Sequence, residues 1–204
     1  MPIVYNQLVA ANAALPGYEV AKQLALHSSV HFGNVDGAHA GIGFGSCRAA
    51  LAVNPTPDVP VAAPLLLNHG AIHPNYGIVF GNSQIAAGGL GQGVLGGPIG
   101  GHAERAALTG AAGLNLFTLN IPAAPNNAIL YVQLAPCPAC QVWLNGGGGG
   151  VVNPFDGVIN AANGGANNVT LDVWWHWPYP AGVAAMVAFN TNDPVNQLIA
   201  IQAW

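Results

Sequence analysis

The sequence predicts an α/β fold, because short strand-like runs alternate along the chain with helix-like segments. Runs rich in β-branched and aromatic residues are typical of strands, and they occupy residues 76–82, 129–134 and 169–175. Segments with helical spacing of apolar residues, or rich in alanine, occupy residues 18–31, 102–114 and 137–144. We therefore expect a sheet flanked by helices.

The apolar run at 183–189 is interpreted as a further strand. It follows the strand at 169–175 after only seven residues, which include Pro178 and Pro180. A parallel crossover needs about a dozen residues or more, usually with a helix. The sequence therefore predicts that these two strands, the fourth and fifth, are antiparallel. We expect residues 1–17 to form a short helix or a covering segment, and residues 195–204 a helix or an edge strand.

Length and composition indicate one domain, 1–204, with a sizeable core. Hydrophobic residues make up 52% of the chain and charged residues only 5%, against about 25% in an average globular domain. The only lysine and arginine residues are Lys22, Arg48 and Arg105. A basic stripe that neutralises phosphates cannot be built from three cations. A polynucleotide would have to be held by stacking, backbone amides or histidines.

The beginning of the sequence lacks the positive and continuous apolar regions of a signal peptide, and no apolar run of about 18 residues is present. These features predict a cytoplasmic protein without a membrane partner, in which cysteines stay reduced. A toxin domain cut from a longer secreted protein would have the same features.

Two short motifs carry the chemistry. His102-Ala103-Glu104 opens a helical pattern, and Pro136-Cys137-Pro138-Ala139-Cys140 follows an apolar strand. Together they match H-x-E and P-C-x-x-C, the signature of zinc-dependent deaminases. Catalytic zinc takes three protein ligands and leaves one position for water. We predict His102, Cys137 and Cys140 as the Zn²⁺ ligands and Glu104 as the catalytic acid and base that moves protons.

The cysteines have two other common interpretations. Cys-x-x-Cys also occurs in redox pairs and as half of a structural zinc site. The only other cysteine, Cys47, is isolated, so four cysteine ligands are not available. A redox pair would leave the His-Ala-Glu segment without a role. A non-catalytic zinc-stabilised interaction module stays open, although such a module has no use for Glu104.

On these motifs, the region 75–144 resembles the core of the cytidine deaminase superfamily. It is more similar to the deaminase domains of bacterial polymorphic toxins than to housekeeping nucleoside deaminases. The resemblance implies a three-layer fold with a mixed five-stranded sheet, and a zinc core at about 75–190. It places zinc between the starts of two helices. Antiparallel fourth and fifth strands are typical of the cytidine deaminase and toxin branch, whereas tRNA adenosine deaminases have a parallel pair.

The resemblance implies hydrolytic deamination of cytosine to uracil, in which water activated by zinc attacks C4 of the base. We expect single-stranded DNA as the substrate, because the likeness to toxins and an aromatic cluster favour a polymer. The alternative substrate is free cytidine, deoxycytidine or a related small heterocycle, which the low number of cations favours. An immunity protein is a further partner that a toxin would have. The oligomeric state is left open.

Five residues are candidates for substrate binding. The Ala103 amide and the Pro136 carbonyl adjoin the expected metal ligands, and an asparagine near the position of Asn82 contacts the ribose or base in related deaminases. Trp177 and Tyr179 belong to an aromatic cluster, in a proline-rich turn where we expect them to be exposed. Stacking of a base on an aromatic side chain contributes roughly 1–3 kcal/mol and needs no cation. We predict that one of these two aromatic residues lines the substrate channel.

Overall fold

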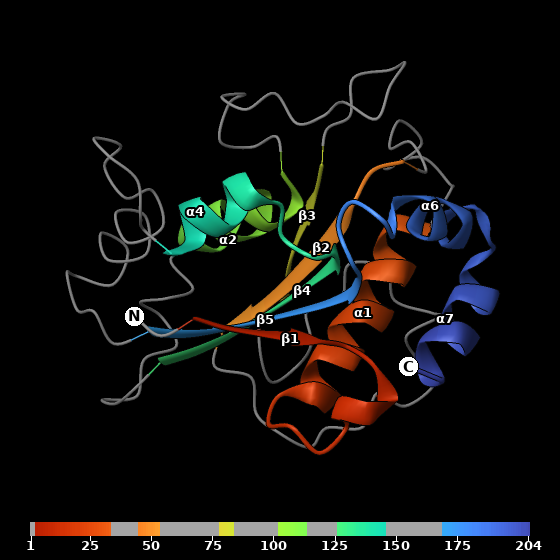
Figure 1. Ribbon diagram of the computed structural model, residues 1–204, viewed down its shortest axis with the longest axis horizontal. Helices are drawn as coiled ribbons and strands as arrows, with labels where there is room; N and C mark the ends of the chain where they lie inside the picture. Colours follow the sequence, from red (N-terminus) through yellow and green to blue (C-terminus); the bar gives the residue numbers. More distant parts are fainter. Residues whose placement is uncertain (1–2, 34–44, 54–77, 84–101, 114–125, 146–168) are drawn as a thin grey trace.

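The computed structural model describes residues 3–33, 45–53, 78–83, 102–113, 126–145 and 169–204. In these ranges a mixed sheet has the order β1-β5-β4-β2-β3, as Figure 1 shows. The strands are β1 (Ile3–Gln7), β2 (Arg48–Val53), β3 (Ile78–Asn82), β4 (Asn126–Leu134) and β5 (Val169–Trp177). β5 is parallel to both β4 and β1, whereas β2 is antiparallel to both β3 and β4. The predicted α/β class with a mixed five-stranded sheet is confirmed.

Helices lie against both faces of the sheet (Figure 1). One face carries α2 (Ala103–Gly113) and α4 (Pro138–Asn145), and the other carries α1 (Tyr18–Gly33), α6 (Val183–Thr191) and α7 (Pro194–Gln202). Successive side chains of a strand point to opposite faces. Val173 of β5 therefore packs in the core with α2 and α4, and the neighbouring Trp174 packs in the core with α1 and α7.

The prediction that the fourth and fifth strands are antiparallel is wrong. Residues 183–191 form α6, whose buried side chains Met186, Phe189 and Asn190 have the spacing of one helical face. Three exposed alanines favour this helix. The short link at 178–182 therefore joins a strand to a helix, and its length says nothing about strand direction.

The strand next to β5 comes from the beginning of the sequence instead. β1 pairs with β5 in parallel, with Ile3 opposite Leu171 and Gln7 opposite Trp175. The expectation of a helix or covering segment at residues 1–17 is thus wrong for β1, although a short 3₁₀ turn follows at Ala10–Asn12. The expected helix at 18–31 is confirmed as α1, and the segment 195–204 forms α7 rather than an edge strand.

Buried polar side chains link α6 and α7 to the sheet by hydrogen bonds. The Gln133 amide nitrogen of β4 donates to the Asn190 side-chain oxygen of α6 at 2.7 Å. The Arg48 guanidinium of β2 donates to the Gln197 side-chain oxygen of α7 at 3.3 Å. Arg48 is 2% exposed, and burial lowers the pKa of its guanidinium to about 10. Buried polar groups need such partners, so the network fixes how both helices sit.

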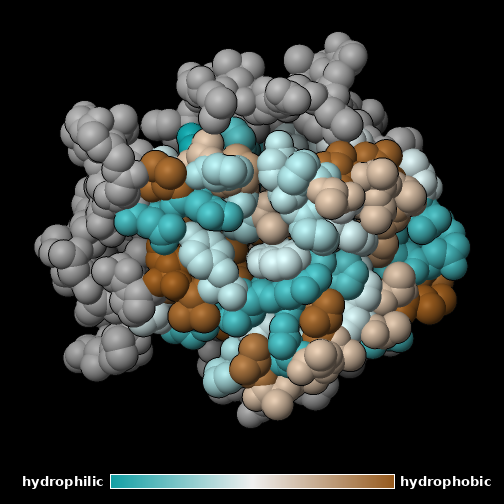
Figure 2. All heavy atoms as spheres, viewed as in Figure 1, coloured by the Kyte–Doolittle hydropathy of each residue, from teal (hydrophilic) through white to brown (hydrophobic). Residues whose placement is uncertain are grey.

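The surface mixes polar and apolar residues. Hydrophobic residues reach the surface in the region of α6 and α7 (Figure 2), and Val195 and Ile199 of α7 are 53% and 61% exposed. Among the helices of the described ranges, none has the length and apolar character needed to cross a membrane.

Candidate metal centre

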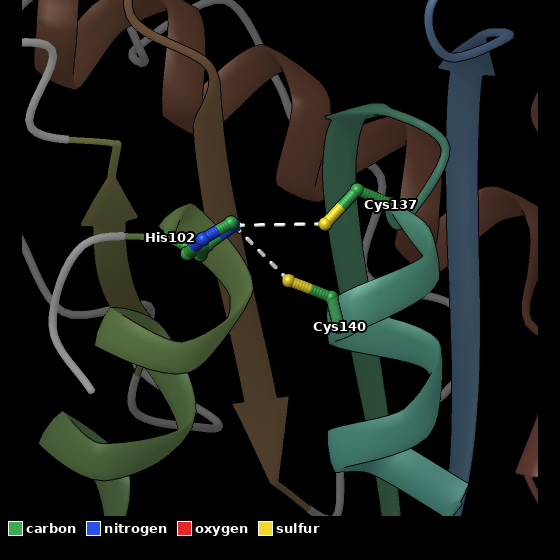
Figure 3. Close-up of side chains that lie close together, drawn as sticks. All are labelled: His102, Cys137 and Cys140. Carbon is green, nitrogen blue, oxygen red and sulfur yellow. Dashed lines mark hydrogen bonds between the residues drawn. The ribbon is translucent and has the colours of Figure 1, made fainter. Parts of the chain in front are cut away.

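The three predicted zinc ligands lie together at the starts of α2 and α4, pointing toward one another (Figure 3). His102 directly precedes α2, Cys137 directly precedes α4, and Cys140 lies in the first turn of α4. The Nδ1 atom of His102 lies 3.2 Å from Cys140 Sγ and 3.8 Å from Cys137 Sγ. All three ligand atoms lie within 4.8 Å of one another.

These distances fit a zinc ion. Zn–S and Zn–N bonds of about 2.0–2.3 Å in tetrahedral geometry separate the ligand atoms by about 3.5–3.8 Å. The two nitrogen–sulfur distances in the structure are 3.2 and 3.8 Å, one slightly below this range and one at its upper end. One imidazole nitrogen and two thiolates are also the kind of donors that zinc prefers. Residues far apart in the sequence thus come together as a group that could supply three ligands of a tetrahedral metal site.

The sheet brings the two helix starts together. β4 ends at Leu134, and Ala135 still donates its amide to the Trp177 carbonyl of β5 before the chain turns into the cysteine motif. α2 packs closely on β3, where Gly81 makes the approach possible. A Cβ atom at Gly81 would collide with the Ala103 carbonyl and lie 2.6 Å from the Ala107 amide nitrogen. The absence of a side chain at Gly81 therefore allows α2, and with it His102, to lie this close to β3.

Arg105 joins the two helices directly. Its Nη2 atom donates to the Ala139 carbonyl in the first turn of α4 at 3.1 Å. Its guanidinium also lies 5.3 Å from the ring centroid of Trp143, a cation–π contact. Because Arg105 follows His102 by three residues and Ala139 precedes Cys140, this contact holds the two ligand-bearing turns at a fixed distance.

The cluster favours a thiolate at Cys137. A hydrogen bond from the Cys140 thiol, followed by one from His102, lowers the pKa of Cys137 to about 4. The same hydrogen bond, with burial, raises the pKa of Cys140. The hydrogen bond to Cys137 also raises the pKa of His102, because it favours the imidazolium form. A cation placed among these groups would replace the shared protons and stabilise both thiolates.

Glu104 lies in the first turn of α2 and is 5% exposed. Burial is the main cause that raises the pKa of its carboxyl group, and the neighbouring Cys137 thiolate contributes as well. A hydrogen bond with Cys140 acts in the opposite direction. Glu104 is therefore a buried acid in contact with a candidate ligand, and it is not one of the three clustered ligands.

Cys47 lies on the same side of the sheet, a position that no pattern in the sequence indicates. It packs against the core of α2 and α4, and it is anchored to β3 by Ser83. The Ser83 hydroxyl accepts from the Cys47 amide at 2.8 Å, and the Ser83 amide donates to the Cys47 carbonyl at 2.8 Å. Burial, followed by the charge of Glu104, raises the pKa of the Cys47 thiol to about 12. Cys47 therefore stays a neutral thiol outside the ligand cluster.

Three of the predicted substrate residues, Asn82, Ala103 and Pro136, belong to the described part of the chain. Asn82 is the last residue of β3, where the sequence placed it, and Ala103 is the buried first residue of α2. The Pro136 carbonyl directly precedes Cys137 and accepts from the Gln141 side chain at 2.8 Å. A carbonyl oxygen has a second lone pair, so Pro136 keeps one acceptor position. Their role in binding stays a prediction.

The two aromatic candidates differ from each other. Trp177 is the last residue of β5 rather than part of a turn, and it is half-buried against Phe189 and Trp204, with ring centroids at 5.0 and 5.4 Å. The expectation that it is an exposed turn residue is wrong, because β5 extends two residues further than predicted. Tyr179 lies in the turn after β5 and is 40% exposed.

Comparison with known proteins adds no relative: no family model, no curated protein and no solved structure matches the chain. The functional argument therefore depends on the geometry of this cluster.

Proposed function

We propose that the protein is a zinc-dependent hydrolase that deaminates an amino-substituted nitrogen heterocycle, with cytosine as the first candidate base. In this reaction the oxygen of water bonds to the ring carbon, the bond from that carbon to the amino group breaks, and ammonia leaves. The reaction needs no oxidant. The two sequence motifs and the arrangement of their side chains support it.

The observation that carries the proposal is the buried carboxyl of Glu104 beside three ligands that leave a fourth metal position. A purely structural zinc site is closed by four protein ligands and needs no adjacent acid. Here the described residues supply one nitrogen and two sulfurs within 4.8 Å of one another. Glu104 is buried next to them in contact with Cys140.

The residues of the chain have separate roles in this proposal. His102, Cys137 and Cys140 hold zinc, which when bound lowers the pKa of a water molecule and so supplies a nucleophile. Glu104 takes a proton from that water and delivers it to the heterocycle and the leaving amine. A carboxyl with a raised pKa suits both steps, because it can be protonated and deprotonated nearer to neutral pH.

Adenine is the second candidate base, because the observed sheet topology removes the argument against it. Antiparallel fourth and fifth strands were the sequence-based argument against an adenosine substrate. Both neighbours of β5 are parallel to it, so that argument no longer applies. Cytosine remains first because the toxin-like resemblance of the motifs points to it.

The test is ammonia release by zinc-loaded wild-type protein and by Glu104→Gln, with cytosine and adenine offered as nucleosides and in oligonucleotides. We expect wild-type turnover to fall at least about 100-fold in Glu104→Gln, the size of a lost general acid–base. Zinc content must stay equal, since Glu104 is not a ligand. A wild-type protein that binds one zinc ion and deaminates neither base would contradict the proposal and favour a zinc-stabilised interaction module.

A further inference from the structure

All three lysine and arginine side chains of the chain are engaged in contacts within the fold. Lys22 of α1 donates to the Gln202 carbonyl of α7 at 2.7 Å, on the face of the sheet opposite the metal cluster. Arg48 is buried on that same face, bonded to Gln197 and lying 5.8 Å from the ring centroid of Phe32. Arg105 lies between α2 and α4, bonded to Ala139.

The histidines of the described ranges add no free cation at the centre. His102 is a candidate ligand. His176 donates from Nδ1 to the Leu8 carbonyl at 2.7 Å and stacks on Trp204 with ring centroids 3.7 Å apart. Burial lowers the pKa of His176, so its ring is neutral near pH 7. The remaining two, His27 and His31, belong to α1 on the opposite face of the sheet.

The centre itself is not cationic once zinc is bound. Two thiolates balance the charge of Zn²⁺, and Glu104 adds a further carboxyl group. Besides Glu104 and Arg105, the described residues next to the ligands in the sequence are uncharged: Ala103, Pro136, Pro138, Ala139 and Gln141. The chain as a whole carries a formal net charge of −4. The one lysine or arginine beside this centre is Arg105, and its guanidinium is already bound to the Ala139 carbonyl and lies over the ring of Trp143. Apart from Arg105, a phosphate brought to the described part of this centre would meet negative or neutral groups, whereas proteins use lysine and arginine to hold phosphate.

We infer that the substrate of this centre is a phosphate-free heterocycle, either the free base or its nucleoside, and not a nucleotide or a nucleic acid. The inference rests on the proposed deamination and narrows its substrate class. The positions of Lys22, Arg48 and Arg105 carry it, because the first two lie on the opposite face of the sheet and the third is already bound between α2 and α4. It replaces the sequence-based preference for single-stranded DNA with the alternative of a small neutral substrate.

The experiment compares the kcat/KM of zinc-loaded protein for cytidine, deoxycytidine, their 5′-monophosphates and a single-stranded oligonucleotide, at low and high salt. The adenine compounds form a parallel set. We expect each nucleoside to exceed its monophosphate by about tenfold or more, and the ratio to shrink as salt screens the repulsion. Equal or faster turnover of a monophosphate or the oligonucleotide, with a rate that falls as salt rises, would overturn the inference and leave the deamination intact.

Binding separates a failure of the inference from a failure of the proposed reaction. Calorimetry with zinc-loaded Glu104→Gln measures the affinity for cytidine and for its monophosphate without turnover. If cytidine binds about tenfold more tightly than its monophosphate, the inference is supported, even where wild-type protein deaminates neither compound. That lack of turnover would contradict only the proposed reaction. Tighter binding of the monophosphate, or binding of neither compound nor of the adenine pair, overturns the inference.

Discussion

Arg105 is the side chain on which the spacing of the two ligand-bearing turns depends. Its bond to the Ala139 carbonyl and its contact with Trp143 link α2 to α4. Arg105→Met keeps the apolar stem but loses the hydrogen bond and the charge. Loss of a group that positions metal ligands typically lowers metal affinity by about 10–100-fold. We expect a loss of this size for zinc, measured by competition with a chromophoric chelator.

The matched control for this prediction is Lys22→Met, which removes a similar bond between a cation and a carbonyl on the opposite face of the sheet. It should leave zinc affinity unchanged. If both variants lose zinc affinity equally, Arg105 acts through general stability rather than by spacing the ligands.

His176 gives the fold a pH dependence. Burial of the ring, which stacks on Trp204, lowers its pKa, and the hydrogen bond to the Leu8 carbonyl acts in the opposite direction. The unfolded chain then binds a proton more readily than the folded chain, so stability is lost as pH falls below the ordinary histidine pKa of about 6.5. We expect the Tm of wild-type protein to fall between about pH 7 and 5, in the range set by that ordinary pKa.

The variant His176→Phe can keep the stacked ring on Trp204 but has no titrating group. Its Tm at neutral pH should be lower, because the bond to Leu8 is lost, and its decline toward acid should be shallower than that of the wild type. Identical slopes for the two proteins would show that other groups cause the acid sensitivity. Both proteins are measured with a chelator present, so that titration of metal ligands does not contribute through zinc release.

At the scale of elements, the close packing of α2 on β3 depends on Gly81. Alanine normally favours a strand over glycine by limiting the unfolded chain. Here its methyl group would meet the Ala103 carbonyl and the Ala107 amide, which are parts of the helix backbone and cannot rotate away. We expect Gly81→Ala to destabilise the protein by about 1–3 kcal/mol, the usual cost of overpacking. Urea unfolding measures this, and a stabilising effect would contradict the close approach.

The same variant should also weaken zinc binding, since displacement of α2 moves His102 relative to the cysteines of α4. This effect distinguishes Gly81→Ala from an ordinary core substitution such as Leu24→Ala in α1, which packs on the opposite face of the sheet. Leu24→Ala should lower stability, by about 2–5 kcal/mol for a buried leucine. Its zinc affinity in the folded state should stay the same.

Elements with a local signal were predictable from the sequence, and elements that depend on distant partners were not. α1, α2, α4, β4 and β5 follow from periodicity, alanine content and β-branched runs. The run Val183 to Phe189 is apolar at every position, so strand and helix share the same pattern and only its packing against the sheet distinguishes them. β1 becomes a strand by pairing with β5, 168 residues later along the chain, and nothing in its own sequence indicates that partner.

The candidate site shows the same division. The types and order of His102, Cys137 and Cys140 followed from the sequence, because zinc chemistry limits the choice of donors. Three other features depend on how β2, β3 and α2 pack, which no local motif describes. They are the His102 nitrogen that faces the two sulfurs, the hydrogen bond from Arg105 to Ala139, and the position of Cys47. Trp177 was misplaced because the end of β5 is set by its pairing with Leu134 of β4.

At the scale of the whole molecule, metal binding should stabilise the fold. The three candidate ligands lie at the starts of α2 and α4, which come together only in the folded chain, so the metal binds the folded state in preference to the unfolded state. Zinc at about 1,000 times its Kd contributes about 4 kcal/mol. For a domain of this size 1 kcal/mol corresponds to a change in Tm of about 2–4 °C, so zinc should raise the Tm by about 8–16 °C. Removal of zinc with a chelator should lower the Tm by this amount, and added zinc should restore it.

Two cysteine variants decide whether this stabilisation arises at the proposed centre. Cys137→Ser removes a ligand and should reduce the zinc-dependent change in Tm to near zero. Cys47→Ser changes the one cysteine outside the Cys-x-x-Cys motif. Because the Cys47 thiol is buried, neutral and outside the cluster, the zinc-dependent change in Tm should persist in this variant. If Cys47→Ser abolished the effect, Cys47 would be a ligand, and a centre closed by one histidine and three cysteines would lack the open position that hydrolysis requires.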